Sequence, residues 1–93
     1  MIIKGNATNR EVTIDGKVLS PQRSQKVHNH SPDGFMWGYG GSGPAQLALA
    51  IMLEITDQET AIAKYQNFKW EKLATLPKDE NFEIVINPED WNK

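Results

Sequence analysis

GYGGSGPAQLALAIML, residues 38–53, joins a loop containing four glycines to the most apolar run of the chain. Pro44 suits the first position of a helix, because its missing N–H would lack a partner there anyway, and Gly43 is then the N-cap. Gln46 stands three residues after Gly43, where its side chain can reach back to the Gly43 N–H. We therefore predict a helix over about residues 44–55. It is apolar nearly all round and too short to cross a bilayer, so we expect it at the buried centre of the domain, with no membrane as a partner.

The residues before the glycine loop predict short strands. Asp15-Gly16 lies between two β-prone runs within residues 11–19. This dipeptide favours a hairpin, because a type I′ turn needs positive φ at both central residues. Residues 1–4 are a further strand candidate, whereas residues 20–31 show no clear period and are expected to run over the surface as a loop.

The aromatic residues just before the glycines alternate with other residues. Phe35, Trp37 and Tyr39 would share one face of a strand over residues 35–39. The segment 32–34, Pro-Asp-Gly, precedes them and predicts a turn, because proline presets φ at the second position of a turn and glycine accepts any φ at its exit.

The residues after the apolar segment predict a second helix and a last strand. Thr56 and Glu59 have the spacing of a capping box and open a helix over about residues 57–76, which Pro77 must end. Residues 82–86 predict the last strand. The apolar stripe of the second helix includes two lysines that we expect to snorkel: Ala61, Ile62, Tyr65, Phe68, Lys69, Lys72, Leu73 and Leu76.

These elements predict an α+β fold for a single domain over residues 1–93. The two helices should be antiparallel or sharply angled neighbours, because the loop between them is very short. A small antiparallel sheet is expected to pack against them, formed by the N-terminal hairpin and by strands near 35–39 and 82–86, with the helices at about 44–55 and 57–76.

Composition narrows the classes of function. The 93 residues include no cysteine, which excludes disulfides, a thiolate zinc site and a cysteine nucleophile. The net charge is −2, but residues 1–43 carry five basic and three acidic side chains, whereas residues 44–93 carry five basic and nine acidic ones. An excess of two charges is too small to predict nucleic-acid binding, whose affinity depends on neutralising phosphates. Residues 1–5 lack the apolar stretch of a signal peptide, so we expect a cytoplasmic protein.

Residues 38–43 match the letters G-x-G-x-x-G between an expected strand and an expected helix. A Rossmann unit needs a second parallel strand after that helix, but residues 56–59 begin another helix instead. The Walker pattern also fails, because Pro44-Ala45 stands where Lys-Ser/Thr would be. Neither nucleotide-binding fold is therefore predicted.

Two interpretations of the glycine loop remain open. Glycines before a helix N-terminus leave backbone N–H groups free for an anion, with Ser42 adding a hydroxyl and Trp37 and Tyr39 adding a stacking surface. In the structural interpretation, the glycines only let the chain turn tightly into a close-packed helix, and Trp37 is part of the core.

The two histidines allow similar alternatives. On a strand, His28 and His30 would share a face and, with Asp33, could hold a divalent metal, but spacing fixes no further ligand. Either histidine could activate Ser42 as a nucleophile. Ser42 is not in a G-x-S-x-G elbow, because proline ends the motif. We favour the structural alternative, in which these polar residues brace the turn at 32–34.

Residues 29–50, NHSPDGFMWGYGGSGPAQLALA, resemble the signature of a family of small uncharacterised domains found in bacteria, archaea and their mobile elements. The similarity covers about half of the chain and extends to Pro77. That family has no established activity, so the resemblance supplies no substrate. It implies that the polar turn and the glycine loop form one unit, and it gives no role to Met36 or Trp70.

These observations favour a small binding module that recognises an anionic or nucleotide-like small molecule, without a cofactor or a metal. The alternative is an interaction or oligomeric accessory protein, for example a phage factor acting on a host component, because three tryptophans are hard to bury fully in a chain of this size. An enzyme ranks third, since spacing alone assembles no catalytic group. The candidate ligand-binding residues are His28, Asn29, His30, Ser31, Trp37, Tyr39, Gly40, Gly41, Ser42, Gly43 and Gln46.

Overall fold

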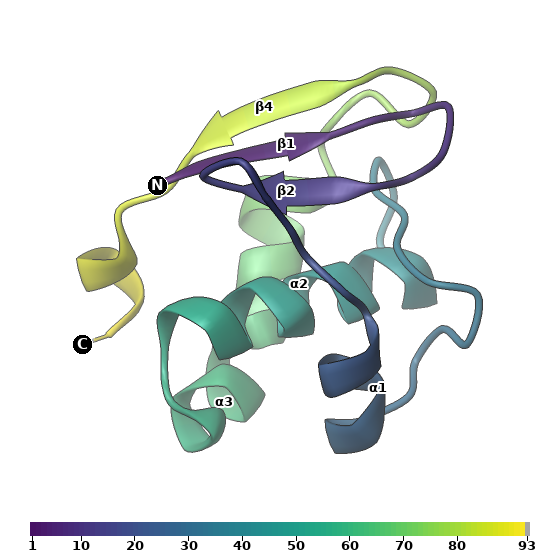
Figure 1. The fold of residues 1–93 in the computed structure, drawn as a ribbon. Coiled ribbons are helices and arrows are strands. Elements are labelled where there is room, and N and C mark those ends of the chain that lie inside the picture. The colour runs from purple at the N-terminus through teal and green to yellow at the C-terminus, as the bar shows by residue number, and fades with distance from the viewer. Residues whose placement is uncertain (93) are drawn as a thin grey trace.

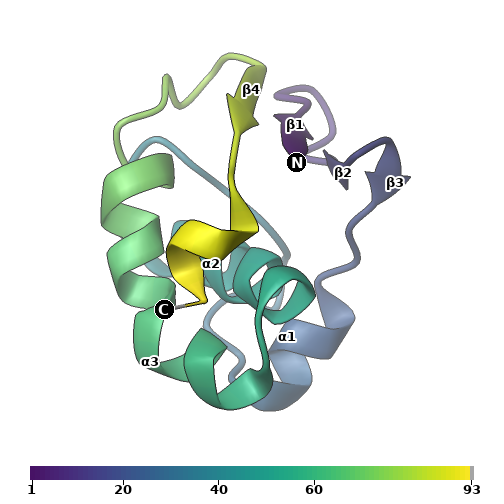
Figure 2. The same ribbon diagram turned by 90° about the vertical axis from the view of Figure 1, so that its left-hand side faces the viewer.

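The computed structural model describes residues 1–92 and has an antiparallel sheet above a group of helices (Figure 1). All the helices lie on the same side of the sheet, so no described element covers the other face (Figure 2). The strand order is β3-β2-β1-β4. The strands are β1 (Ile2–Gly5), β2 (Val12–Ile14), β3 (Lys17–Val18) and β4 (Phe82–Val85). The helices are α1 (Gln22–Val27), α2 (Ser42–Ile55), α3 (Gln58–Phe68), a π-helix (Lys69–Leu73) and a 3-10 helix (Pro88–Trp91). The α+β fold is confirmed.

The predicted hairpin is confirmed. β2 and β3 pair around Asp15 and Gly16, whose φ angles are 48° and 83°. The Asp15 carboxylate also accepts a hydrogen bond from the Ile2 N–H at 2.7 Å, which ties the turn to the neighbouring β1. Alternation along β1 points Ile3 into the core, whereas Ile2 faces outward.

The predicted central helix is also confirmed, with a different start. α2 is buried along almost its whole length and begins at Ser42, with Gly41 rather than Gly43 as the N-cap. Pro44 therefore lies within the first turn, where it still removes no helical hydrogen bond. The Gln46 side chain does not return to Gly43 and bonds elsewhere, as described below.

The predicted strand at 35–39 is wrong. This segment is irregular, because Gly38 has a φ of +85° and donates its N–H to the carbonyl of Leu73 at 2.9 Å rather than to a strand. Phe35 and Trp37 are buried, but Tyr39 is 39% exposed, so the three rings do not share one environment. The alternation reflects two core contacts made by an extended loop.

Two other expectations need correction. Residues 20–31 contain the short helix α1, whose Ser24 hydroxyl donates to the Pro21 carbonyl at 2.7 Å. The second helix is capped by Asp57 and not by Thr56: the Asp57 carboxylate accepts a hydrogen bond from the Thr60 N–H at 2.7 Å. The Thr56 hydroxyl instead donates to the Met52 carbonyl in the last turn of α2.

The second helix also changes type before Pro77. After Phe68 it widens into the π-helix, in which Ala74 N–H donates to the Lys69 carbonyl, five residues back, at 2.8 Å. Ile62, expected in the buried stripe, is 51% exposed, whereas Lys69 is only 6% exposed.

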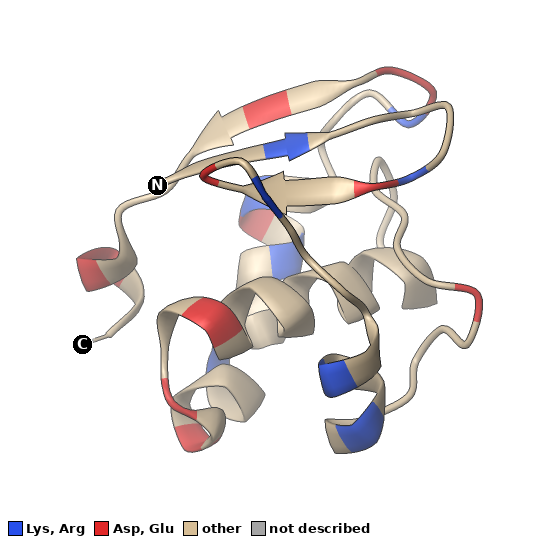
Figure 3. Cartoon of the chain, in the orientation of Figure 1, with Lys and Arg blue, Asp and Glu red and all other residues tan. Residues whose placement is uncertain are grey.

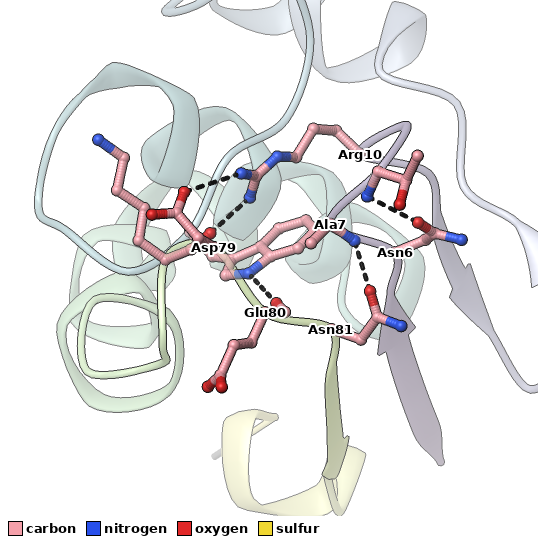
Figure 4. A network of polar contacts seen from close by, with 9 residues as sticks. Asn6, Ala7, Arg10, Asp79, Glu80 and Asn81 are labelled. Atoms are coloured by element: carbon pink, nitrogen blue, oxygen red, sulfur yellow. Dashed lines mark hydrogen bonds and ion pairs between the residues drawn. The ribbon is translucent and has the colours of Figure 1, made fainter.

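Arg10 lies at the centre of a polar network that covers Trp37 (Figure 4). Its guanidinium lies 4.7 Å from the Trp37 ring centroid and donates to the Lys78 carbonyl at 2.7 Å. It is also 3.6 Å from the carboxylate of Asp79, and the Trp37 indole N–H donates to the Glu80 carbonyl at 3.1 Å. The network fixes the loop after β1 against the loop before β4 and holds the buried indole between them.

Candidate functional site

Gln46 joins two parts of the predicted site. Its side chain is fully buried, and its Oε1 accepts hydrogen bonds from the backbone N–H groups of His30 at 2.7 Å and Ser31 at 3.0 Å. Its Nε2 donates to the Ser24 hydroxyl at 2.8 Å and to the His28 carbonyl at 3.1 Å. These four bonds use the full capacity of the amide. Gln46 therefore fastens α1 and the histidine loop onto α2, and none of its polar atoms is left for a ligand.

The two histidines stack on each other. The rings of His28 and His30 are parallel within 1°, with centroids 3.9 Å apart, and His30 Nε2 lies 2.7 Å from the Tyr65 hydroxyl. Burial lowers the pKa of His30 below its ordinary value, and the nearby charges of His28 and Lys69 lower it further. No hydrogen bond joins either ring to Ser42 within residues 1–92, so the structure does not assemble the serine–histidine pair.

At each glycine of the loop, a neighbouring residue fills the space that a side chain would need. A Cβ at Gly40 would overlap the ring of Trp70, and a Cβ at Gly43 would meet the side chain of Met36. A Cβ at Gly41 would meet the ring of Tyr39. Trp70 and Met36, to which the resemblance gave no role, are thus the residues for which these glycines make room.

The N-terminus of α2 is open beside this loop. Among residues 1–92 no side chain caps it, and Ser42 is exposed, whereas Gly43 is buried. Ala45 N–H bonds to the Gly41 carbonyl at 3.1 Å, Pro44 has no N–H, and no hydrogen bond to the N–H of Ser42 or Gly43 occurs in the described part of the chain. The positive end of the helix dipole therefore has no side-chain cap beside it within residues 1–92.

Two lysines and two aromatic rings surround this helix end. Trp70 is 58% exposed, and Lys69 Nζ lies 4.4 Å from its ring centroid. Lys78 Nζ lies 5.1 Å from the ring centroid of Tyr39. We call Tyr39, Ser42, Lys69, Trp70 and Lys78 the Trp70 surface.

Lys69 is the least exposed charged group on the Trp70 surface. Its Nζ donates to the Gly40 carbonyl at 2.9 Å, and no carboxylate lies within ion-pair distance among residues 1–92. An ammonium has three N–H donors, so this single bond leaves donor capacity over. The structure therefore holds a nearly buried positive charge next to an open helix N-terminus.

Sequence reasoning missed Lys69 and Trp70 as site residues. In a regular helix, consecutive residues point about 100° apart, and Lys69 was expected to snorkel out of an apolar stripe. The π-helix changes the spacing, and both side chains contact Gly40. Single π turns are rare and often occur at functional sites, but the sequence carries no distinct signal for one here.

The predicted site residues do not converge on one pocket. Trp37 is in the core, Gln46 is saturated, and Asn29 is exposed beside the stacked histidines. Two hollows lie elsewhere, one of about 470 Å³ beside β1 and β4 and one of about 430 Å³ between β3 and α1. No predicted site residue lines either hollow. We therefore choose the Trp70 surface as the candidate site, because of its charges.

Within the described residues, no three His, Asp or Glu side chains lie close enough together to hold a metal ion. No helix in residues 1–92 is both long enough and apolar enough to cross a membrane. No curated protein and no solved structure matches the chain. A family model matches residues 3–91, nearly the whole sequence, and the chain therefore belongs to DUF6166, a family of unknown function.

Proposed function

We propose that the chain is a small binding module that takes an anionic, nucleotide-like ligand on the Trp70 surface. The observation that carries this proposal is Lys69, a nearly buried ammonium without a carboxylate partner among residues 1–92, beside the uncapped N-terminus of α2. Burying a charge without a counter-charge costs free energy, and a bound anion offsets that cost.

The Trp70 surface has separate groups for the anionic part and for the planar part of such a ligand. The backbone N–H and the hydroxyl of the exposed Ser42, together with the Lys69 ammonium, are suited to a phosphate or carboxylate. The exposed ring of Trp70 is suited to stacking on a planar base. In this proposal Gln46 and the histidine loop support the site from behind and do not touch the ligand.

Isothermal titration with a panel of nucleotides, sugar phosphates and cyclic dinucleotides tests the proposal. We expect saturable binding of at least one compound that weakens about tenfold or more in Lys69→Met, because a charge-assisted contact is removed. Lys17→Met, which removes a lysine from the distant β3, is the matched control and should bind as the unmodified chain does. The proposal fails if no compound binds more tightly than about 1 mM.

Ser42→Asp is a sharper variant than a glycine substitution. It places a negative charge at the open helix end and should abolish anion binding, while a carboxylate at that position suits the helix dipole and leaves the fold stable. Gly41→Val is unsuitable, since its side chain would push the Tyr39 ring away. A folded Ser42→Asp variant that still binds the ligand would contradict the site.

A second candidate, an interaction or oligomeric accessory protein, is favoured by two exposed apolar side chains on one helical segment, Ile62 at 51% and Trp70 at 58%. The resemblance described above extends it to a factor of bacteria, archaea or their mobile elements that acts on a host component. Light scattering coupled to size exclusion tests self-association, and a strict monomer at high concentration argues against the oligomeric form.

A further inference from the structure

We propose that the free edge of β4 binds an extended, basic segment of a partner protein, which adds to the sheet as a further strand. This surface is separate from the Trp70 surface, and the inference does not depend on the proposed function. It rests on the register of β4, on the side chains at its outer face and on the acidic residues around it.

The register leaves backbone groups of β4 unpaired. β4 is at the end of the strand order, and Ile86 N–H donates to the Met1 carbonyl at 2.9 Å. Hydrogen-bonded pairs alternate along an antiparallel ladder, so Ile84 also bonds toward β1. The N–H and C=O groups of Glu83 and Val85 then point away from the sheet, where no described strand lies.

The outer face of β4 combines apolar and acidic side chains. Val85 is 73% exposed and pairs with Ile2 of β1, which is 43% exposed. Two residues earlier on the same face, Glu83 lies 3.5 Å from Lys4. An added strand would place one side chain beside Val85 and another beside Glu83, so a partner needs an apolar and a basic residue in alternation on that face.

Acidic residues continue beyond both ends of β4. In Figure 3 the ribbon is coloured for Asp and Glu on β4, in the turn before it and on the 3-10 helix after it. These residues are Asp79, Glu80, Glu83, Glu89 and Asp90, and Lys78 is the one basic residue in the segment 78–90. The hollow of about 470 Å³ beside Glu83 is also lined by Lys4, which pairs with Glu83, and by Glu11 and Asn81, which are suited to a Lys or Arg side chain.

The charge pattern selects a basic partner and opposes a second copy of this chain. If two β4 strands paired with each other, the two acidic segments would lie together, and like charges across strands are destabilising. Opposite charges steer and orient a partner, whereas a charged edge such as Glu83 protects the free chain from self-pairing.

The test uses the full chain, labelled with ¹⁵N, and a short synthetic peptide that repeats Lys-Thr-Val-Thr, so that Lys and Val alternate along one face of the added strand. We expect amide exchange at Glu83 and Val85 to slow by about tenfold or more when the peptide binds, because new ladder hydrogen bonds protect those amides. The same peptide with Glu in place of every Lys is the control for charge and should give no protection.

Two substitutions at one position separate the backbone contact from the side chain. Val85→Pro removes an N–H that the fold does not use and is tolerated on an edge strand, so it should abolish binding in a chain that melts as before. Val85→Thr keeps the N–H and the β-branched shape and should retain binding. If Val85→Pro unfolds the chain, Glu83→Lys replaces it and should weaken binding of the basic peptide.

Three outcomes overturn the proposal: no protection of the β4 amides by the basic peptide, shifts confined to the Trp70 surface, or concentration-dependent protection of β4 in the free chain. The last outcome would identify a second copy of the chain as the occupant.

Discussion

Gln46→Leu should be among the most destabilising single substitutions in this chain. The leucine has a similar volume but leaves the N–H groups of His30 and Ser31 without their acceptor, and Ser24 and the His28 carbonyl without their donor. Each unsatisfied buried group costs roughly 1–3 kcal/mol, although water reaches some of these partly buried groups, so we expect a loss of about 2–4 kcal/mol. In a domain of this size the melting temperature should fall on the order of 10 to 20 °C.

Urea unfolding followed by circular dichroism measures this loss. Gln66→Leu is the matched control, since Gln66 is exposed on α3 and its substitution should change the free energy of unfolding by less than about 0.5 kcal/mol. If Gln46→Leu is as stable as the unmodified chain, the reasoning that assigns Gln46 to the fold is refuted. A stable Gln46→Leu chain that loses ligand binding would return Gln46 to the binding site.

Three further predictions test other parts of the structure by the same unfolding assay. Gly38 and Gly16 have nearly the same φ, 85° and 83°, but only Gly38 lies against a neighbouring backbone, that of Lys78. Gly38→Ala should therefore lower the free energy of unfolding more than Gly16→Ala does, and equal losses would contradict this packing. Arg10→Ala should cost about 1–3 kcal/mol, because the Arg10 side chain is only 24% exposed and lies over the Trp37 ring, whereas Arg23→Ala, on an exposed ion pair, should cost less than about 0.5 kcal/mol. The reverse order would contradict the role given to the network. The pKa of His30 is lower in the folded chain than its ordinary value of 6.5, so the unfolded chain binds the proton more readily and the free energy of unfolding should fall as the pH drops below 6.5. The same dependence of stability on pH in His30→Gln would show that His30 is not its cause.

Features coded by a few neighbouring residues were predictable from the sequence. The hairpin follows from Asp15-Gly16, whose positive φ values the turn requires. The buried position of α2 follows from its nearly uniform apolar sequence, and β4 follows from a short β-prone run. Each of these signals is local and needs no information about distant contacts.

Features set by distant contacts were not predictable. The segment 35–39 alternates like a strand, but Arg10 and the loop at 78–81 hold Trp37 as part of an irregular loop. The short helix α1 depends on the hydrogen bond between Ser24 and Gln46, which is twenty-two residues away along the chain. No local pattern marks either contact.

The sequence predicted where the candidate site lies along the chain, but not which side chains form it. The glycine loop was identified at the start of the central helix, yet the loop's glycines make room for Trp70, Tyr39 and Met36. Lys69 reaches Gly40 from a π-helix that no local sequence pattern predicted. The resulting arrangement of a buried charge and an exposed ring is visible only in three dimensions.

An NMR titration of the ¹⁵N-labelled chain with a nucleoside monophosphate tests the central claim most directly. Binding at the Trp70 surface predicts saturable shifts of the Trp70 indole N–H and of the Ser42 and Gly43 amides, which disappear in Lys69→Met and persist in Lys17→Met. Unchanged signals for these three groups, or equal shifts in the two lysine variants, would contradict the claim.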